Sequence, residues 1–362
     1  MNDFKAEPAA VKEAMMAAVS RVIDSGWYVL GDEVKRFEKS WAQRCDCEFG
    51  VGVGNGMDAI EIGLRALGIG AGDEVITTPM TAFASVLAVL RCGATPVLAD
   101  IDPETAHLDM SSVERCLSPR TKAVVLVHLY GQVADMGAWQ AFCRNKGVYL
   151  VEDCAQSHLA QWQGKSAGSF GAFGAYSFYP TKNLGAVGDG GMLVTSDQGL
   201  ADKAAQLRNY GQSVRYHHPV LGMNSRLDEL HAAMLAERLK WLDEFTEARR
   251  QVAHAYWDRI SNPAVQLLKR PTSRGSHVHH LFVLTTDRRD ALQAHLTSKG
   301  VQTHIHYPIP VHHQEPCRDI VRDPQGLVHA EAHALRCLSL PCHPFLTDAE
   351  VATVVDAVNS FA

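Results

Sequence analysis

A lysine in a glycine-rich segment is the residue of this sequence best suited to chemistry. Lys182 follows a β-rich run that ends at Tyr179-Pro180, within the segment SFYPTKNLGAVGDGG. A lysine becomes a nucleophile when its surroundings lower its pKa, and it can then form a Schiff base with a carbonyl group. A solvated loop lysine is the simpler interpretation, but the flanking glycines indicate that the backbone closely approaches another group.

Two further polar residues follow the β-rich run VYLVED. Asp153 stands at the end of this run, Gln156 comes shortly after it, and Glu152 is expected to face the opposite side of the strand. Acidic side chains at strand ends are often only solvated, or cap a helix. A carboxylate at Asp153 could also hold a cationic ring nitrogen, because an adjacent positive charge keeps both partners ionised.

A glycine-rich turn is the third feature, in the segment VGVGNGMDAIEIGLRALGIG. The residues from Gly54 to Gly56 separate a strand-like run from a helix that we expect to begin near Met57-Asp58. Glycines let backbone amides approach a phosphate, and a helix N-terminus favours an anion. The alternative is an ordinary tight turn in which Asp58 caps the helix.

These three features follow one another along the chain in an order that suits one cofactor. A phosphate turn, a strand-end acid and then a lysine suit a phosphorylated pyridine aldehyde, which is pyridoxal phosphate. This cofactor acts as an electron sink, while the protein supplies a lysine tether, an acid at the ring nitrogen and a seat for the phosphate.

The elements that must position these residues have the pattern of an α/β protein. Several β-rich runs are apolar at consecutive positions, as in strands buried on both faces. Alternation of strands and helices predicts a mainly parallel sheet with helices on both sides, which binds ligands at the carboxyl ends of its strands. The β-rich runs are EVITTP, TPVLADI, KAVVLVH, VYLVED, FGAYSF and GMLVTS, and helices are expected at 11–23, 33–44, 59–67, 82–91, 111–117, 136–146 and 200–208.

The pattern changes in the last third of the chain. From about Ser225 it predicts one long connector helix that ends at Asn262-Pro263. The remainder again alternates strand and helix, through HLFVLTT, RDALQAHLTSKG and QTHIHYP. We therefore expect a large cofactor-binding domain at 1–245 and a smaller C-terminal α/β domain at 246–362.

Composition excludes some classes of protein. The chain has 362 residues and a net charge of -6, without the clusters of lysine and arginine that bind nucleic acid. No apolar run approaches the roughly 20 residues needed to span a bilayer, and no secretion signal is visible. The nine cysteines are scattered, which favours reduced thiols and a cytoplasmic location.

The sequence resembles the DegT/DnrJ/EryC1/StrS sugar aminotransferase family, within the fold-type I pyridoxal-phosphate enzymes. The resemblance covers nearly the whole chain, from WYVLGDEVKRFE to HPFLTDAEV. The strongest blocks are LVHLYGQVADM, VEDCAQSH, GSFGAFGAYSFYPTKNLGAVGDGG, LRNYGQ, NSRLDELHAAML and HIHYPIPVH. So many blocks in one order make chance agreement implausible.

The resemblance implies roles for residues around the cofactor ring. Lys182 matches the Schiff-base lysine, which also moves the proton between the substrate and the cofactor. Asp153 matches the partner of the ring nitrogen, and Gln156 matches the residue that binds the ring hydroxyl. Phe83 matches the aromatic residue that stacks on the ring.

The resemblance also implies how the phosphate is held. Ser177 matches a phosphate ligand, and Asn224 matches one that reaches over from the neighbouring subunit, so a homodimer with shared active sites is expected. Many members have a hydroxyl residue where this chain has Met57, and methionine cannot donate a hydrogen bond. Backbone amides from Gly56 to Asp58 must then do more of that work. The apolar residue is also a weak pointer to members that act at C-3 of keto sugars.

Histidines in the C-terminal third raise the question of a metal. Two pairs would each share a strand face, namely His277 with His279 and His304 with His306. Such pairs can bind metals, but no acidic or cysteine companion stands at ligand spacing, so we expect no metal. The resemblance places HIHYP at the rim of the active site, where His306 or Tyr307 would contact substrate. His312 and His313 are expected in a loop.

The predicted reaction is a two-step transamination. L-glutamate, the usual donor of the family, gives its amino group, and the ketone of a nucleotide-linked sugar receives it. A dTDP-linked 3-keto-6-deoxyhexose is the preferred acceptor, and a 4-keto sugar nucleotide is the closest alternative. A sugar dehydratase of the family has histidine in place of the lysine, and a regulatory or sugar-binding protein would have lost catalysis. Intact Asp153, Gln156 and Lys182 argue against both.

Overall fold

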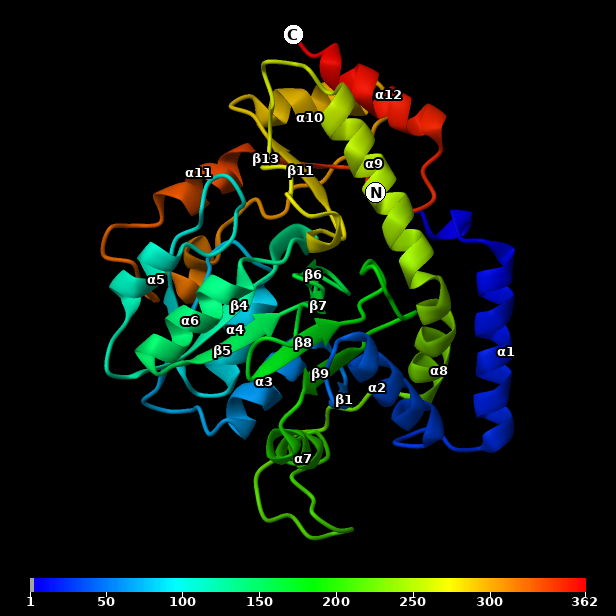
Figure 1. Ribbon diagram of the computed structural model, residues 1–362, viewed down its shortest axis with the longest axis vertical. Helices are drawn as coiled ribbons and strands as arrows, with labels where there is room; N and C mark the ends of the chain where they lie inside the picture. Colours follow the sequence, from blue (N-terminus) through cyan, green and yellow to red (C-terminus); the bar gives the residue numbers. More distant parts are fainter. Residues whose placement is uncertain (1–2) are drawn as a thin grey trace.

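The fold is dominated by an eight-stranded sheet, seen at the centre of Figure 1. The computed structural model describes residues 3–362. The strand order is β1-β9-β8-β5-β4-β2-β3-β12, and every neighbouring pair is parallel except β1 with β9 and β9 with β8. The strands are β1 (Phe49–Val53), β2 (Glu74–Thr77), β3 (Thr95–Leu98), β4 (Thr121–Val127), β5 (Tyr149–Asp153), β8 (Phe173–Ser177), β9 (Gly191–Thr195) and β12 (Val321–Arg322). The predicted mainly parallel sheet is confirmed.

Helices cover both faces of this sheet, as the apolar runs require. One buried cluster packs the sheet against α2 (Asp32–Arg44), α5 (Met110–Cys116), α6 (Met136–Lys146) and α8 (Glu229–Arg238). A second cluster packs the other face against α3 (Gly56–Ala66), α4 (Phe83–Arg91) and α7 (Gln198–Leu207). Because both faces are covered, strands such as β2 and β9 are buried at every position.

The C-terminal third builds a smaller antiparallel sheet, at the top of Figure 1. Its strands are β10 (Gln266–Leu267), β11 (Phe282–Thr285) and β13 (Cys337–Leu340), and it packs against α9 (Leu242–Arg259), α10 (Arg289–Ser298) and α12 (Asp348–Asn359). A further buried cluster, which includes residues of α11 (Val328–Arg336), joins the two sheets. The division near residue 245 stays a prediction, and α9 runs across it.

Two predicted elements differ from the structure. The long connector helix is broken by the 3-10 turn Leu239–Trp241, because α8 packs with the large sheet whereas α9 packs with the small one. It ends at Arg259, and Asn262 is occupied in hydrogen bonds to the carbonyl oxygens of Val358 and Phe361, each at 2.7 Å. The segment QTHIHYP forms only an isolated bridge, between His304 and Ser339, instead of a strand.

The N-terminal region lies outside the sheet. A 3-10 turn, η1 (Phe4–Ala6), precedes α1 (Ala9–Ser25), and α1 packs on α8 at the right of Figure 1. Gly26 adopts φ 65° and caps α1, so the predicted stop at Ser25-Gly26 is confirmed. The remaining pair of short strands, β6 (Gln161–Trp162) and β7 (Lys165–Ser166), forms a hairpin. No helix within residues 3–362 has the length and apolar character to cross a membrane.

Candidate active site

The segment that carries Lys182 is a compact turn at the carboxyl end of β8. The amide of Lys182 donates to the carbonyl oxygen of Tyr179 at 2.9 Å. A Cβ atom at Gly185 would lie 2.4 Å from the carbonyl oxygen of Pro180, so only glycine fits there without displacement. The flanking glycines predicted a close approach of the backbone to another group. At Gly185 that group is the backbone of Pro180, and this contact holds the turn with Lys182 at the edge of the sheet.

The surroundings of Lys182 change its acidity. Burial lowers the pKa of the Lys182 amine from 10.5 to about 8, while the negative charge of Asp153 acts in the opposite direction. The unprotonated amine is therefore much more abundant near neutral pH than it is for an ordinary lysine. Such an amine can act as a nucleophile and as a general base.

Asp153 presents its carboxylate at the end of β5. It is 6% exposed, and its Oδ2 accepts a hydrogen bond of 2.7 Å from the hydroxyl of Ser85. Its Oδ1 accepts one of 3.1 Å from the amide of Ala155. Ser85 is itself held by the hydroxyl of Thr81 at 2.8 Å. The carboxylate is thus fixed in orientation, with lone pairs left for a further donor.

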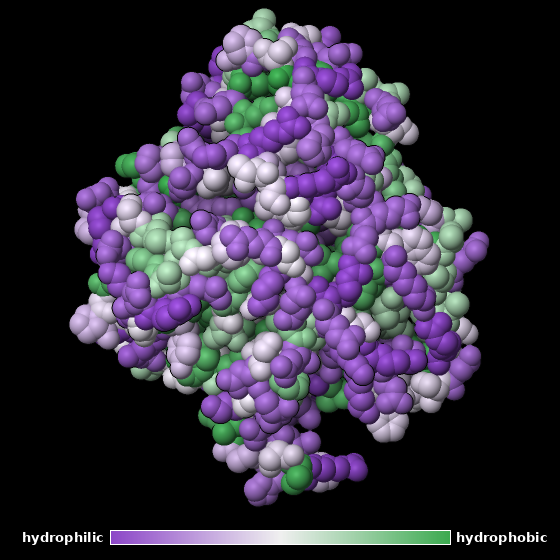
Figure 2. Space-filling model, viewed as in Figure 1, coloured by the Kyte–Doolittle hydropathy of each residue, from purple (hydrophilic) through white to green (hydrophobic). Residues whose placement is uncertain are grey.

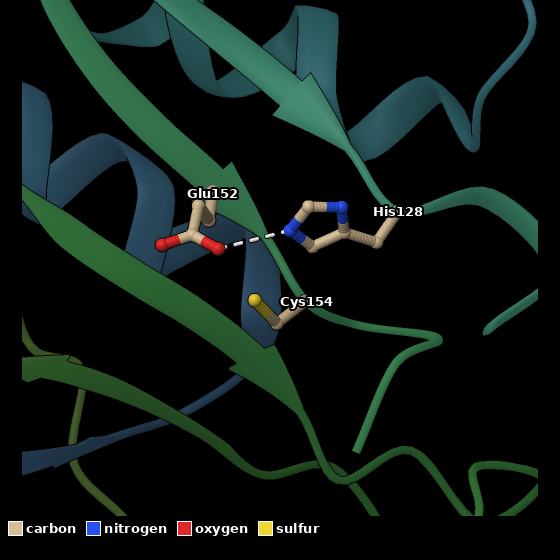
Figure 3. Close-up of side chains that lie close together, drawn as sticks. All are labelled: His128, Glu152 and Cys154. Atoms are coloured by element: carbon tan, nitrogen blue, oxygen red, sulfur yellow. Dashed lines mark hydrogen bonds and ion pairs between the residues drawn. The ribbon is translucent and has the colours of Figure 1, made fainter. Parts of the chain in front are cut away.

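Glu152 faces the other side of β5, as predicted. Figure 3 shows its carboxylate beside His128, whose Nε2 lies 3.0 Å away, and near Cys154. Both oxygens also accept hydrogen bonds of 2.7 to 2.8 Å from the amides of Gly168, Phe170 and Gly171. Burial raises the pKa of the Cys154 thiol well above its usual range. This cluster anchors the turn before β8 and has no oxygen to spare for a metal.

Gln156 links the acid strand to the C-terminal third. Its Oε1 accepts a hydrogen bond of 2.6 Å from the amide of Tyr130, and its Nε2 lies 3.2 Å from the hydroxyl of Tyr307. The hydroxyl of Tyr130 donates to the carbonyl oxygen of His306 at 2.6 Å. One hydrogen of the Gln156 amide remains for another acceptor. The structure therefore brings Gln156, His306 and Tyr307 together, as the placement of HIHYP predicted.

The phosphate turn has two unused amides. Asn55 caps α3, and its Oδ1 accepts a hydrogen bond of 2.9 Å from the amide of Asp58. Within residues 3–362 the amides of Gly56 and Met57 donate no hydrogen bond. A Cβ atom at Gly56 would lie 2.7 Å from Cβ of Ser177, so glycine lets this helix start meet the end of β8. Two free amides and the Ser177 hydroxyl therefore lie together at a helix N-terminus, which attracts anions.

Nearly the whole chain matches a single family description. Residues 9–359 match the DegT/DnrJ/EryC1/StrS aminotransferase family. The chain belongs to this family. Its enzyme class, an aminotransferase, and the pyridoxal-phosphate cofactor of such enzymes are thereby confirmed.

Individual relatives and a solved structure agree with the family match. A dTDP-3-amino-3,4,6-trideoxy-alpha-D-glucose transaminase from Streptomyces venezuelae is 43% identical, over 99% of this chain and 95% of its own. A protein of Geobacillus stearothermophilus named pleiotropic regulatory protein is 41% identical, over 100% and 98%. The crystal structure of S. venezuelae DesV with a ketimine intermediate is 42% identical, covers 99% and 96%, and has a TM-score of 0.95. The fold-type I architecture is thereby confirmed.

Asp58 of this DegT/DnrJ/EryC1/StrS member forms hydrogen bonds that hold the turn before α3. Its amide is bound to Asn55, and its Oδ2 accepts a hydrogen bond of 2.6 Å from the hydroxyl of Ser225. The same hydroxyl accepts one of 2.9 Å from the amide of Gly54. The contribution of Asp58 to a phosphate seat stays a prediction, whereas the alternative that Asp58 caps the helix is wrong, because Asn55 is the cap. Asp58 and Ser225 brace the turn, and Asn224 next to them is exposed.

Phe83 and His306 are the remaining residues predicted to contact cofactor or substrate. Phe83 is the first residue of α4, two positions before Ser85, and its ring is partly exposed. His306 lies 2.8 Å from the hydroxyl of Ser339 through its Nδ1, and burial, with the charges of His304 and Lys182, lowers its pKa to about 4. A neutral imidazole can both donate and accept a hydrogen bond.

The other histidines do not have the arrangement expected of them. His277 and His279 are stacked with ring centroids 3.8 Å apart and lie outside any strand. His312, predicted in a loop, lies with His313 in the 3-10 turn Val311–His313 and is 1% exposed. Its Nε2 lies 3.0 Å from Glu331, while its Nδ1 has no partner within residues 3–362. Metal binding at Nε2 would leave a buried N–H without an acceptor, which is costly.

Sequence reasoning missed three residues that support this site. Ser85 orients Asp153, Tyr130 orients Gln156, and Ser225 ties the phosphate turn to the segment after α7. Tyr130 stands in the block LVHLYGQ, and a polar residue at a strand end is a usable signal. Ser85 and Ser225 have no such local signal, because their roles depend on contacts across 68 and 167 positions of the chain.

Proposed function

We propose that the chain transfers the amino group of L-glutamate to the ketone of a nucleotide-linked sugar, preferably a dTDP-linked 3-keto-6-deoxyhexose. The observation that carries this proposal is the Lys182 amine, with a pKa of about 8, beside the carboxylate of Asp153. The Streptomyces venezuelae relative is named for a dTDP-linked 3-amino-trideoxy sugar, which supports the nucleotide and the carbon position. A 4-keto sugar nucleotide is the alternative acceptor.

The groups at this edge of the large sheet fit pyridoxal phosphate in charge and shape. The free amides of Gly56 and Met57, with the hydroxyl of Ser177, suit the phosphate. The partly occupied carboxylate of Asp153 suits a protonated ring nitrogen, and the amine of Lys182 suits an aldehyde. Phe83 and Gln156 would hold the ring face and the ring hydroxyl, as in the family.

The residues then have distinct tasks in the reaction. Pyridoxal phosphate, when bound, supplies an electron sink for the carbon that carries nitrogen. Lys182 Nζ takes the proton from that carbon in the glutamate half-reaction and returns a proton to the sugar carbon in the other half. Such proton transfer by a positioned side chain contributes about 10²- to 10⁴-fold in rate. Asp153, held by Ser85 and Ala155, keeps its negative charge next to the ring nitrogen.

A second copy of the chain would complete the site. The segment 211–222 projects below α7 in Figure 1, and Figure 2 shows a small hydrophobic spot among mostly hydrophilic side chains at this end of the molecule. Val214, Tyr216 and Leu221 are 67%, 79% and 88% exposed. Large exposed apolar side chains on a projecting segment suit a protein interface. We propose that this interface forms a homodimer in which the exposed Asn224 reaches the phosphate of the partner's cofactor.

The state of the cysteines supports a proposal about where the enzyme acts. All nine cysteines are free, and eight of them are buried. Free thiols persist in a reducing compartment, so we propose that the enzyme acts in the cytoplasm.

Replacement of Lys182 tests the proposal. We expect Lys182→Ala to reduce amination of the sugar at least about 10³-fold, because the tether and the proton-transfer group are both lost. The protein is incubated with L-glutamate and 3-keto and 4-keto sugar nucleotides, and the product is identified by NMR. Lys203→Ala, at an exposed position on α7, is the matched control and should keep full activity. Full turnover by Lys182→Ala would refute the mechanism.

A non-catalytic role is the competing proposal of another class. The relative named pleiotropic regulatory protein raises it. A protein of that kind would bind a sugar nucleotide but would form no amino sugar and would show no borohydride-sensitive absorbance band that depends on Lys182. Amination at C-4 alone would leave the enzyme class intact and would overturn only the preference for C-3.

A further inference from the structure

The N-terminal turn η1 lines two cavities at the proposed active site. One is a narrow space of about 20 Å³ that touches Asp3, Phe4 and Lys182. The other is larger, about 260 Å³, and lies between Phe4, the lysine turn and the histidines of the C-terminal third. Phe4 is shared by both and is 47% exposed. In Figure 1 this blue segment lies beside α9 and the red segment before α12.

The turn is tied to the lysine loop by one arginine. The guanidinium of Arg238 donates to the carboxylate of Glu7 at 2.6 Å and, through its other nitrogen, to the carbonyl oxygen of Gly185. Glu7 is 8% exposed, so this ion pair is shielded from water. Lys12 Nζ donates to the carbonyl oxygen of Lys5 at 2.9 Å and holds the turn against α1. Phe4 therefore has a defined place relative to Lys182.

The larger cavity has the chemistry of a sugar-ring subsite. Its polar lining consists of Thr181, His280, His304 and His306, and its apolar lining consists of Phe4, Leu281, Leu340 and Cys342. Small-molecule pockets usually begin at about 300 Å³, so this space suits one hexose ring and leaves the nucleotide outside. The two kinds of lining match a ring that bears both hydroxyl groups and a methyl group.

Two histidines of this cavity, His280 and His306, are buried and have a lowered pKa, so they are neutral hydrogen-bonding groups. Burial and the charge of Lys182 lower the pKa of His280 well below its usual range. Nδ1 of His280 lies 3.2 Å from Oδ1 of Asn183, next to Lys182 in the chain. Because Nδ1 of His280 donates to this oxygen, its Nε2 remains as an acceptor, which suits a hydroxyl group better than a phosphate.

We propose that this cavity holds the hexose and that Phe4 is its outer wall, against which the C-6 methyl group of a 6-deoxy sugar packs. This inference rests on the proposed function and adds a specificity residue outside the cofactor site. The N-terminal turn thereby favours 6-deoxy sugars over their 6-hydroxy counterparts, because packing on the phenyl ring buries a methyl group favourably but removes water from part of a hydroxyl group.

The test uses two ligands that differ only at C-6. They are dTDP-3-amino-3,6-dideoxyglucose and dTDP-3-amino-3-deoxyglucose, added to the holoenzyme so that the reverse half-reaction is followed by cofactor absorbance. We expect Phe4→Ala to lower the preference of kcat/KM for the 6-deoxy ligand about tenfold, since an apolar pocket rejects a ligand with one added hydroxyl group by at most about 10²-fold. Isothermal titration calorimetry should show the same loss of preference in affinity.

Controls separate this effect from general damage. The glutamate half-reaction and the thermal unfolding midpoint should not change in Phe4→Ala, and Phe4→Leu should restore most of the preference. Met16→Ala, at a 68% exposed position on α1, is the matched control. An unchanged preference in Phe4→Ala, or an equal loss in both half-reactions, would overturn the inference. If the wild-type chain aminates no sugar nucleotide, the proposed function itself fails, whatever Phe4 does.

Discussion

Glu152 and Asp153 are neighbours on β5, and their carboxylates lie on opposite faces of the large sheet because side chains alternate along a strand. Glu152 is 0% exposed and has four donors around it, namely His128 and the amides of Gly168, Phe170 and Gly171. Asp153 has two, from Ser85 and Ala155. A carboxylate can accept about four hydrogen bonds, so only Asp153 has capacity left.

This difference shows how two neighbouring carboxylates on one strand can have different roles, one in folding and one in ligand binding. The fully occupied carboxylate organises the backbone of the turn before β8. The partly occupied one is held still but remains open to a ligand, and its charge reaches Lys182. Spare hydrogen-bonding capacity in a fixed orientation distinguishes the acid that is available for function from the acid that serves the fold.

Glu152→Gln should give the largest effect on stability. Glutamine has an NH2 group where Glu152 has one of its oxygens. This NH2 group would face backbone N–H groups that donate to Glu152, so at least one buried N–H loses its acceptor. Breaking such a buried network costs about 3 to 5 kcal/mol in the free energy of unfolding. Urea denaturation of the holoenzyme measures this loss. Glu114→Gln removes an exposed pair with Lys146 and is the control, with little change expected. Unchanged stability in Glu152→Gln would refute its structural role.

Asp153→Asn should affect activity rather than stability. Asparagine keeps the shape and the hydrogen bond from Ser85 but cannot hold a ring nitrogen in its protonated form. We expect kcat to fall about 10²-fold, which is about 2.7 kcal/mol in the activation barrier. The unfolding free energy should stay within about 1 kcal/mol of the wild type. Steady-state kinetics and urea denaturation measure both quantities, and a loss of stability equal to that of Glu152→Gln would erase the contrast between the two acids.

The smallest expected effect is a shift in a pH profile. Only the unprotonated amine of Lys182 attacks an aldehyde, so capture of pyridoxal phosphate by the apoenzyme should speed up as pH rises and level off above the pKa of about 8. The negative charge of Asp153 raises this pKa, so Asp153→Asn should move the midpoint to lower pH. Stopped-flow absorbance follows the reaction. Glu152→Gln should leave the midpoint in place, and an alkaline shift in Asp153→Asn would contradict the assignment.

The sequence predicted the alternating elements well, because hydrophobic periodicity and glycine signals are local. The strand that carries Asp153, the strand that precedes the Lys182 turn and the stop at Gly26 are examples. The break at Leu239–Trp241 could not be read from the sequence, since it depends on which sheet each half of the connector contacts. No glycine or proline marks it.

The candidate site was predictable in its residues but less so in their partners. Lys182, Gln156 and Tyr307 lie where the ordered motifs placed them. The capping role considered for Asp58 belongs to Asn55, which also favours helix caps, and the Asp58 carboxylate instead accepts a hydrogen bond from Ser225 in a distant segment. Hydrogen-bond partners that are far apart in the chain carry no pattern in a single sequence.

The short strand β12 has a consequence for how the chain is made. Its residues pair with β3, roughly 220 positions earlier, and complete the outer edge of the large sheet. During synthesis on the ribosome this edge stays open until Val321 and Arg322 emerge. An open strand edge can pair with other chains, so a nascent or truncated protein that lacks these residues is exposed to aggregation. The last third of the chain thus covers the β3 edge of a sheet whose other strands are all translated earlier.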